Sequence, residues 1–322
     1  MQQRQRSYWI LYLAMTSIGM GQTVVFAVMP MLGRKLGLHE IIFEVPLLAL
    51  SFAPKELAIT SLSAITALTF SVISPWWGRL SDRIGRKKVI ILGLFGYTVG
   101  ISVFNSAAAL GLYGVLTGAG LFALLFVTRV FHATVMSASI PASSAYIVDV
   151  TDGSNRSQGL SRLSAATQVG TLCGPILTAL LAIHFLAPFI FQSILTAIMG
   201  LLLLWFLPKS PQLKYRPGAK KLALADARFR WFLLLSLGVY TAMGAVQQTL
   251  GFYFQDVLHL TPENAAKWFS IAMIGSSAAM LFSQLFLVQR VRLQPMTYVL
   301  IGLPIMAAGF GVFGLILKRL NL

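Results

Sequence analysis

The feature that most limits how this 322-residue chain can fold is a series of nine apolar runs. They cover residues 8–32, 57–77, 89–109, 121–148, 163–183, 188–207, 231–254, 266–288 and 296–317. A helix of about 20 apolar residues crosses the hydrocarbon core of a bilayer. Because only 11% of the residues are charged, a soluble fold of this size would lack polar surface. The sequence therefore predicts an all-α, multi-pass membrane helix bundle.

Positive charges are distributed unevenly among the loops between these runs. With a cytoplasmic N-terminus, 18 of the 25 Lys and Arg residues lie on the cytoplasmic side and six on the other side. This is the asymmetry that the positive-inside rule describes. The sequence thus predicts a cytoplasmic N-terminus. Basic cytoplasmic loops also explain the net charge of +16, so we expect no nucleic-acid partner.

An internal repeat divides the chain. Trp9 and Leu36 recur as Trp231 and Leu258, which is a shift of 222 residues in both cases. A polar stretch, 208–230, follows the sixth run. The pattern is typical of two parallel repeats. We therefore expect an N-terminal six-helix half (1–207), a cytoplasmic linker (208–230) and an incomplete C-terminal half (231–322).

A glycine-rich and arginine-rich segment lies between the second and third runs. Residues 78–88 read GRLSDRIGRKK. Glycines allow close helix approach and a tight turn, and three guanidinium groups can hold the carboxylate of Asp82 and neighbouring carbonyls. The residues of this gating motif are Gly78, Arg79, Asp82, Arg83, Gly85, Arg86 and Lys87. The alternative is a basic loop that only sets the topology.

This segment resembles the signature G-x-L-x-D-R-x-G-R-R/K of the major facilitator superfamily. The resemblance implies a twelve-helix transporter fold, of which this chain holds about nine helices, and a motif that joins the two halves in one transport state. It also implies secondary active transport, with proton-coupled export of a small organic molecule or drug by alternating access, as in tetracycline and multidrug efflux proteins. A bacterial inner membrane follows as the location, with membrane lipid around the protein.

Other sequence features exclude some functions. The motifs G-x-S-x-G, H-E-x-x-H and G-x-x-x-x-G-K-[ST] are absent from the sequence, so we expect no enzyme, no metal and no cofactor. The alternative to transport is a non-transporting membrane protein or an inactive transporter fragment.

Arg129 is the one Lys or Arg residue inside a predicted span, and His132 follows on the same helical face. A charge there is costly, so it marks a functional site or a structural hydrogen-bonding role. The string Arg-Val-Phe-His-Ala departs in its last two positions from the superfamily motif R-x-x-Q-G, and the resemblance implies a proton or substrate route. Gln22 occupies the first run, where many cation exporters have a carboxylate, which favours neutral or anionic substrates.

Two further patterns lie around the fifth run. Gly170, Gly174 and Pro175 resemble the antiporter signature G-x-x-x-G-P-x-x-G-G, although its last two glycines are replaced by Thr178 and Ala179. Close helix packing explains the same residues. Upstream, AYIVDVTDG ends the fourth run in a way that is similar to drug efflux proteins. We expect Asp149 and Arg156 to pair there as a second cytoplasmic charge cluster, or else to form a solvated loop.

The repeat also bears on completeness. A shift of 209 pairs Gly93 with Gly302, and by this shift the end of a sixth helix in the second half would fall well beyond Leu322. We therefore expect helices 10 to 12 to be absent and the chain alone not to transport. Truncation, a disrupted gene or a split protein completed by a separate chain would each explain this.

Overall fold

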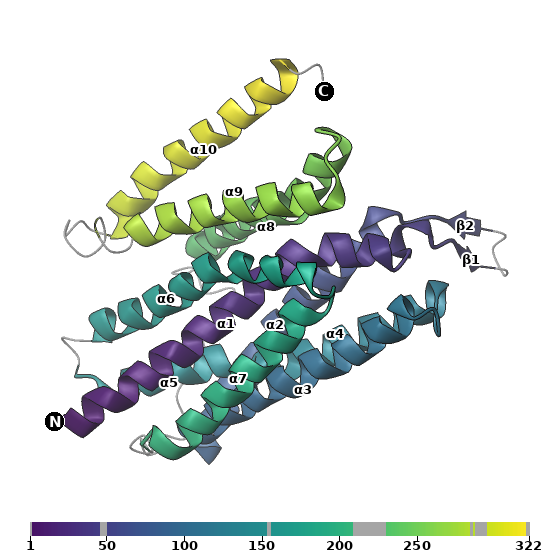
Figure 1. Ribbon diagram of the computed structural model, residues 1–322. Helices are drawn as coiled ribbons and strands as arrows, with labels where there is room; N and C mark the ends of the chain where they lie inside the picture. Colours follow the sequence, from purple (N-terminus) through teal and green to yellow (C-terminus); the bar gives the residue numbers. More distant parts are fainter. Residues whose placement is uncertain are drawn as a thin grey trace.

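The computed structural model describes residues 2–45, 50–152, 156–208, 230–283, 286 and 295–319. Its helices form a bundle in which long segments run side by side (Figure 1). The α-helices are α1 (Gln2–Lys35), α2 (Glu56–Ile84), α3 (Arg86–Leu112), α4 (Gly118–Met136), α5 (Ser139–Val150), α6 (Arg156–Cys173), α7 (Ala187–Phe206), α8 (Arg230–Asp256), α9 (Pro262–Phe282) and α10 (Pro295–Arg319). Two 3₁₀ segments, η1 (Leu38–Glu40) and η3 (Gly174–Ala182), complete the helical part.

Each of the nine predicted spans is mostly helical in its described residues. Within the described residues, seven helical segments are long and apolar enough to cross a membrane, and two shorter apolar helices correspond to the last two runs. A short antiparallel hairpin, β1 (Phe43–Val45) with β2 (Leu50–Phe52), links α1 to α2 and pairs Glu44 with Ser51. The all-α membrane bundle is thus confirmed. The predicted linker 208–230 lies almost entirely outside the described residues.

Glycines mark the turns between consecutive helices. Gly85 separates α2 from α3 with φ of 101°, a backbone conformation that favours glycine, so the predicted tight turn is confirmed. Gly114 and Gly118, with φ of 71° and 60°, separate α3 from α4 within the long apolar stretch. No such conformation occurs at Gly78, and a Cβ atom there would meet nothing within 4 Å. The prediction that Gly78 permits close helix approach is therefore wrong.

Prolines break two of the predicted spans. The fourth run is divided into α4 and α5 at Ser137 and Ala138, just before Pro141. A proline inside a helix donates no backbone hydrogen bond, and its ring clashes with the carbonyl four residues earlier. The fifth run changes from α-helix to 3₁₀-helix at Gly174, next to Pro175. Both breaks lie within apolar sequence, where hydropathy alone gives no signal.

Two apolar cores lie at opposite ends of helices α1–α7. The first surrounds the C-terminal part of α1, with Val28, Leu32 and Phe104 among its members, and we call this side the Arg34 end. The second surrounds the N-terminal part of α1, with Leu11 and Trp77, and we call it the Asp82 end. These cores hold the helices that carry every candidate site residue.

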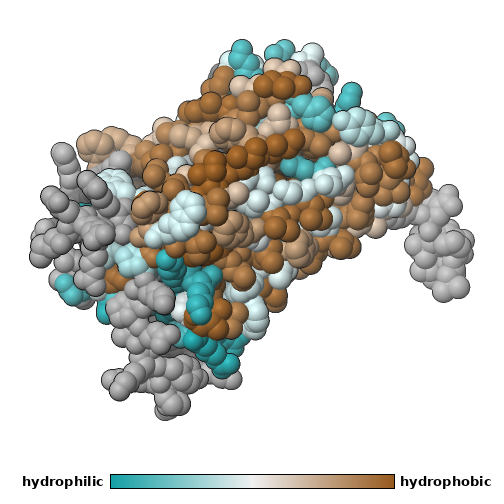
Figure 2. Space-filling model, turned by 60° about the horizontal axis from the view of Figure 1, so that its bottom comes forward, coloured by the Kyte–Doolittle hydropathy of each residue, from teal (hydrophilic) through white to brown (hydrophobic). Residues whose placement is uncertain are grey.

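Helices α8–α10 are attached less tightly. They meet the rest of the bundle where α8 and α9 contact α1, α6 and η3. Helix α10 lies at the edge of the bundle (Figure 1). All of its described side chains between Met296 and Val312 are exposed or half-buried. Apolar side chains also cover most of the face shown in Figure 2, as expected for a surface in contact with lipid.

Candidate functional site

Arg86 is the centre of the gating motif at the Asp82 end. Its guanidinium pairs with Asp82 of α2, and its Nε lies 3.0 Å from Oδ2 of Asp149 at the end of α5. Nη1 donates to Oγ of Ser81 at 2.5 Å and to the carbonyl oxygen of Gly78 at 3.4 Å. One side chain thus joins three helices, and the geometry matches the fork of donors that only arginine offers.

The other basic residues of the motif do different things. Arg79 and Arg83 are exposed and make no ion pair in the described structure, so the expectation that three guanidinium groups hold Asp82 is wrong. Lys87 donates from Nζ to the carbonyl oxygen of Leu204 at 2.8 Å. Leu204 lies in the last turn of α7, where a helix leaves carbonyls unpaired and favours positive charge.

The predicted pair of Asp149 and Arg156 is also wrong. Asp149 is bound by Arg86, and its side chain is only 6% exposed. Arg156, at the first position of α6, is exposed. The carboxylate at the end of α5 therefore belongs to the gating motif rather than to a separate charge cluster.

Replacing Arg86 by glutamine is expected to lower the free energy of unfolding by roughly 2 to 3 kcal/mol, because the nearly buried Asp149 carboxylate would lose its ion pair. Arg83→Gln is the matched control, since it removes an equal charge that forms no ion pair with any described residue, and we expect a change within about 0.5 kcal/mol. Melting of the detergent-solubilised protein measures both. Equal losses in the two variants would contradict the central role of Arg86.

Arg129 lies inside the bundle, on α4. The residue is 2% exposed, its Nη1 is 3.3 Å from Nδ1 of His132, and its guanidinium lies 5.3 Å from the ring centroid of Phe104 on α3. Arginine can only donate, so Nδ1 of His132 accepts and the histidine proton sits on Nε2. Arg129 Nε and His132 Nε2 have no partner within the part of the chain that the structure describes. The cluster is therefore a buried cation that contacts no described carboxylate.

Tyr97, which lies outside the predicted site, completes this buried polar cluster. Its ring packs edge-on against His132 with centroids 4.7 Å apart, and its buried hydroxyl has no hydrogen-bond partner among the described residues. A Cβ atom on Gly21 of α1 would collide with that hydroxyl and would lie 2.9 Å from Nε2 of Gln192 on α7. Gln192 was visible in the sequence as an intramembrane polar residue, but Tyr97 gave no distinguishing signal.

Gln22 is not part of the cluster. It is half-buried on α1 and is absent from the contacts of Arg129 and His132. Of the three residues predicted for a transport route, the structure therefore brings together Arg129 and His132 only.

The Gly170 motif forms the contact between α1 and α6. A Cβ atom on Gly170 would collide with the carbonyl oxygen of Thr16, and one on Gly174 would collide with Oγ1 of Thr23. Pro175 has no N–H to donate to the carbonyl of Thr171, and Oγ1 of Thr23 donates to that oxygen at 3.1 Å. The motif thus builds a close backbone contact in which a threonine of one helix satisfies the carbonyl that proline leaves free in the other.

These observations define the class of protein: an all-α, multi-pass membrane bundle with a charge cluster at one end and buried polar side chains between its helices. Residues 11–320 match the profile of the Major Facilitator Superfamily. The chain belongs to this superfamily.

Individual relatives agree. The chain is 28% identical over 220 residues to the class C tetracycline resistance protein of Escherichia coli, which covers 68% of this chain and 52% of that protein. It is 24% identical over 291 residues to the quinolone resistance protein NorA of Staphylococcus aureus, covering 87% of this chain and 65% of NorA. The chain therefore spans about half the length of the tetracycline resistance protein.

Solved structures share the fold. The human organic anion transporter MFSD10 (TETRAN) matches with a TM-score of 0.60 at 20% identity, covering 90% of this chain and 73% of that one. A bacterial homologue of the human lysosomal transporter Spinster, in an inward-facing and unoccupied conformation, matches with a TM-score of 0.55 at 16% identity, covering 87% of this chain and 62% of that one.

Proposed function

We propose that this chain functions in secondary active transport, as proton-coupled export of a small organic molecule by alternating access. Membership of the superfamily supports transport. Two of the relatives are named as tetracycline and quinolone resistance proteins, and these names support export of drug-like molecules. The observation that carries the proposal within the structure is the buried cluster of Arg129, His132 and Tyr97, because a buried cation that contacts no described carboxylate is costly inside a membrane bundle and marks a functional site.

The cluster also bears on the substrate. Arg129 supplies a buried positive charge, and the described carboxylates of Glu56, Asp82, Asp149 and Asp256 all lie at helix ends. A bundle with this charge arrangement suits neutral or anionic molecules better than cationic ones.

The proposal is tested in everted membrane vesicles that contain the chain, with an imposed proton gradient and a panel of tetracyclines, quinolones and organic anions. We expect at least one compound to be accumulated and to dissipate part of the proton gradient. Accumulation without any effect on the gradient would contradict proton coupling. No flux for any compound, with the protein present and folded, would contradict transport by this chain and favour a non-transporting membrane protein.

We further propose a bacterial inner-membrane location with the N-terminus and the Asp82 end in the cytoplasm, because basic residues gather on that side. Reporter fusions after Arg86 and after Lys221 are expected to report a cytoplasmic position, and a fusion after Glu263 a periplasmic one. Paired alkaline phosphatase and fluorescent protein reporters measure this at each site. A reversal at any of the three would contradict the assignment of spans.

A further inference from the structure

One set of polar contacts joins α1 to α8 at the Arg34 end. Nη2 of Arg34 lies 3.0 Å from both carboxylate oxygens of Asp256, and Nη1 donates to Oε1 of Gln255 at 2.8 Å. The guanidinium also lies 5.3 Å from the ring centroid of Phe252, and Nη2 donates to Glu56 at the start of α2 at 3.1 Å. A single arginine thus binds the last turns of α8 to two helices of the N-terminal part.

The position of this contact follows from the internal repeat. Arg34 and Asp256 are 222 residues apart, which is the shift that relates Trp9 to Trp231. The two halves of a major facilitator fold are related by an axis along the membrane normal. A direct bond between equivalent positions of two such repeats has to lie near that axis. The contact therefore lies where a path between the halves would open at the Arg34 end.

Near the Asp82 end, the described part of α8 has no buried residue. The buried residues of α8 are Gly251, Phe252 and Gln255, all in its last two turns. Trp9 and Trp231, the equivalent residues near the opposite end, are each 67% exposed. Among the described residues, the buried part of α8 thus lies at the Arg34 end.

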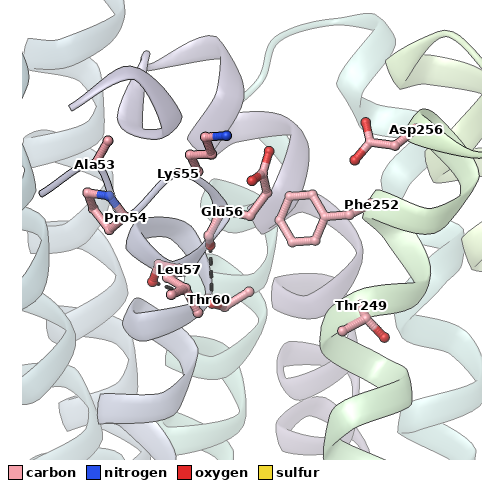
Figure 3. A pocket seen from close by; sticks show the side chains of 9 residues that line it. All are labelled: Ala53, Pro54, Lys55, Glu56, Leu57, Thr60, Thr249, Phe252 and Asp256. Carbon is pink, nitrogen blue, oxygen red and sulfur yellow. Dashed lines mark hydrogen bonds between the residues drawn. The ribbon is translucent and has the colours of Figure 1, made fainter. Parts of the chain in front are cut away.

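A cavity of about 520 Å³ between α2 and α8 borders the contact, and Glu56 and Asp256 are among the residues that line it. In Figure 3 the carboxylates of Glu56 and Asp256 approach from opposite walls, with the ring of Phe252 beside them. The side chain of Arg34 is 22% exposed, that of Glu56 38% and that of Asp256 54%. Ion pairs with this exposure are weak enough to break and re-form, unlike pairs enclosed in a core.

We propose that Arg34 is a gating residue, and that Arg34, Glu56, Gln255 and Asp256 form an outer gate that holds the periplasmic end closed while the cytoplasmic end is open. This inference rests on the proposed function for the direction of the two ends and for the existence of a transport cycle. In the outward-open state α8 moves away from α1 and α2, and Arg34 exchanges Asp256 and Gln255 for water while it can keep Glu56.

The gate is tested by distances across the cavity. Spin labels are placed on cysteines at Thr60 and Thr249, which line opposite walls, in a chain with Cys173→Ser. Arg34→Gln is expected to raise the ratio of long to short label distances roughly three- to tenfold, which is the effect of losing one or two charge-assisted bonds at a partly exposed site. Asp256→Asn should act in the same direction. The double variant should not exceed the larger single effect, because both changes remove the same contact.

The control is Lys35→Gln, which removes the neighbouring charge. Nζ of Lys35 lies 5.8 Å from the ring centroid of Phe185. Both residues precede α8 in the chain, so this contact does not join α1 to α8. This variant should leave the distances unchanged. Unchanged distances in both Arg34→Gln and Asp256→Asn, or an equal change in Lys35→Gln, would overturn the gate. Asp256→Asn keeps the test valid if Arg34→Gln does not fold, because Asp256 is more than half exposed.

A second label pair separates this inference from the proposed function. With labels at Trp9 and Trp231, alternating access predicts that Arg34→Gln shortens the distance at the cytoplasmic end while the distance between Thr60 and Thr249 lengthens. If only the outer distance changes, the gate is supported and alternating access is contradicted. If the vesicles transport substrate and neither distance changes, transport is supported and the gate is wrong.

Discussion

Gly170→Ala is expected to lower the free energy of unfolding by about 2 kcal/mol or more, although it adds a single methyl group. The new Cβ atom would collide with the backbone carbonyl of Thr16, and backbone cannot move aside as a flexible side chain can. Helices α1 and α6 would have to separate along their shared contact. Thermal melting in detergent, followed by size-exclusion chromatography, measures the loss.

The control for this change has the opposite sign. Gly238 lies in α8, and a Cβ atom there would meet nothing within 4 Å. Gly238→Ala should therefore raise stability by up to about 1 kcal/mol, because alanine is the better helix former. A melting temperature for Gly170→Ala at or above that of the parent chain would show that the close contact of α1 and α6 is not formed in the protein.

The second large effect concerns Arg129. Arg129→Lys and Arg129→Ala are both expected to abolish most transport in the vesicle assay, because a lysine cannot reproduce the arginine fork beside His132 and Phe104. Arg129→Met, which keeps the volume and removes the charge, should preserve or raise thermal stability while it also abolishes transport. Initial rates of accumulation and melting temperatures, measured on the same preparations, separate the two effects.

Two outcomes would contradict this role. Normal transport by Arg129→Lys would show that any positive charge is sufficient. A large fall in the melting temperature of Arg129→Met would show that the guanidinium is retained for structure, through its hydrogen bond to His132 and its contact with the ring of Phe104.

Much of the fold could be predicted because it depends on local composition. Each apolar run is mostly helical in its described residues, and the turn at Gly85 lies where the motif predicted it. The partners within the sites could not be predicted in the same way. The rotation of α2, α3 and α5 about their axes decides which arginine binds Asp82 and which arginine Asp149 faces. That rotation is set by packing between segments that are distant in the sequence.

The contact of Arg34 with Asp256 is an instructive intermediate case. No local pattern distinguishes either residue, since both lie at the end of an apolar run among other polar residues. Their spacing nevertheless equals the shift of the internal repeat, so the sequence held the signal that places both residues near the axis. The spacing indicates a contact only where equivalent ends of α1 and α8 approach each other, and the structure shows that they do at the Arg34 end.

The side chains of the 3₁₀ segment η3 lie in three straight rows along the helix. With three residues per turn, side chains three apart lie directly above one another. One row, Gly174, Leu177 and Leu180, packs on the core around α1, and Thr178 on the next row lies 3.3 Å from Ser270 of α9. The third row, Ile176, Ala179 and Ala182, is exposed along its whole length. In this segment, the positions that tolerate substitution should therefore recur every three residues. In α6 they should recur about every 3.6 residues, as in an α-helix.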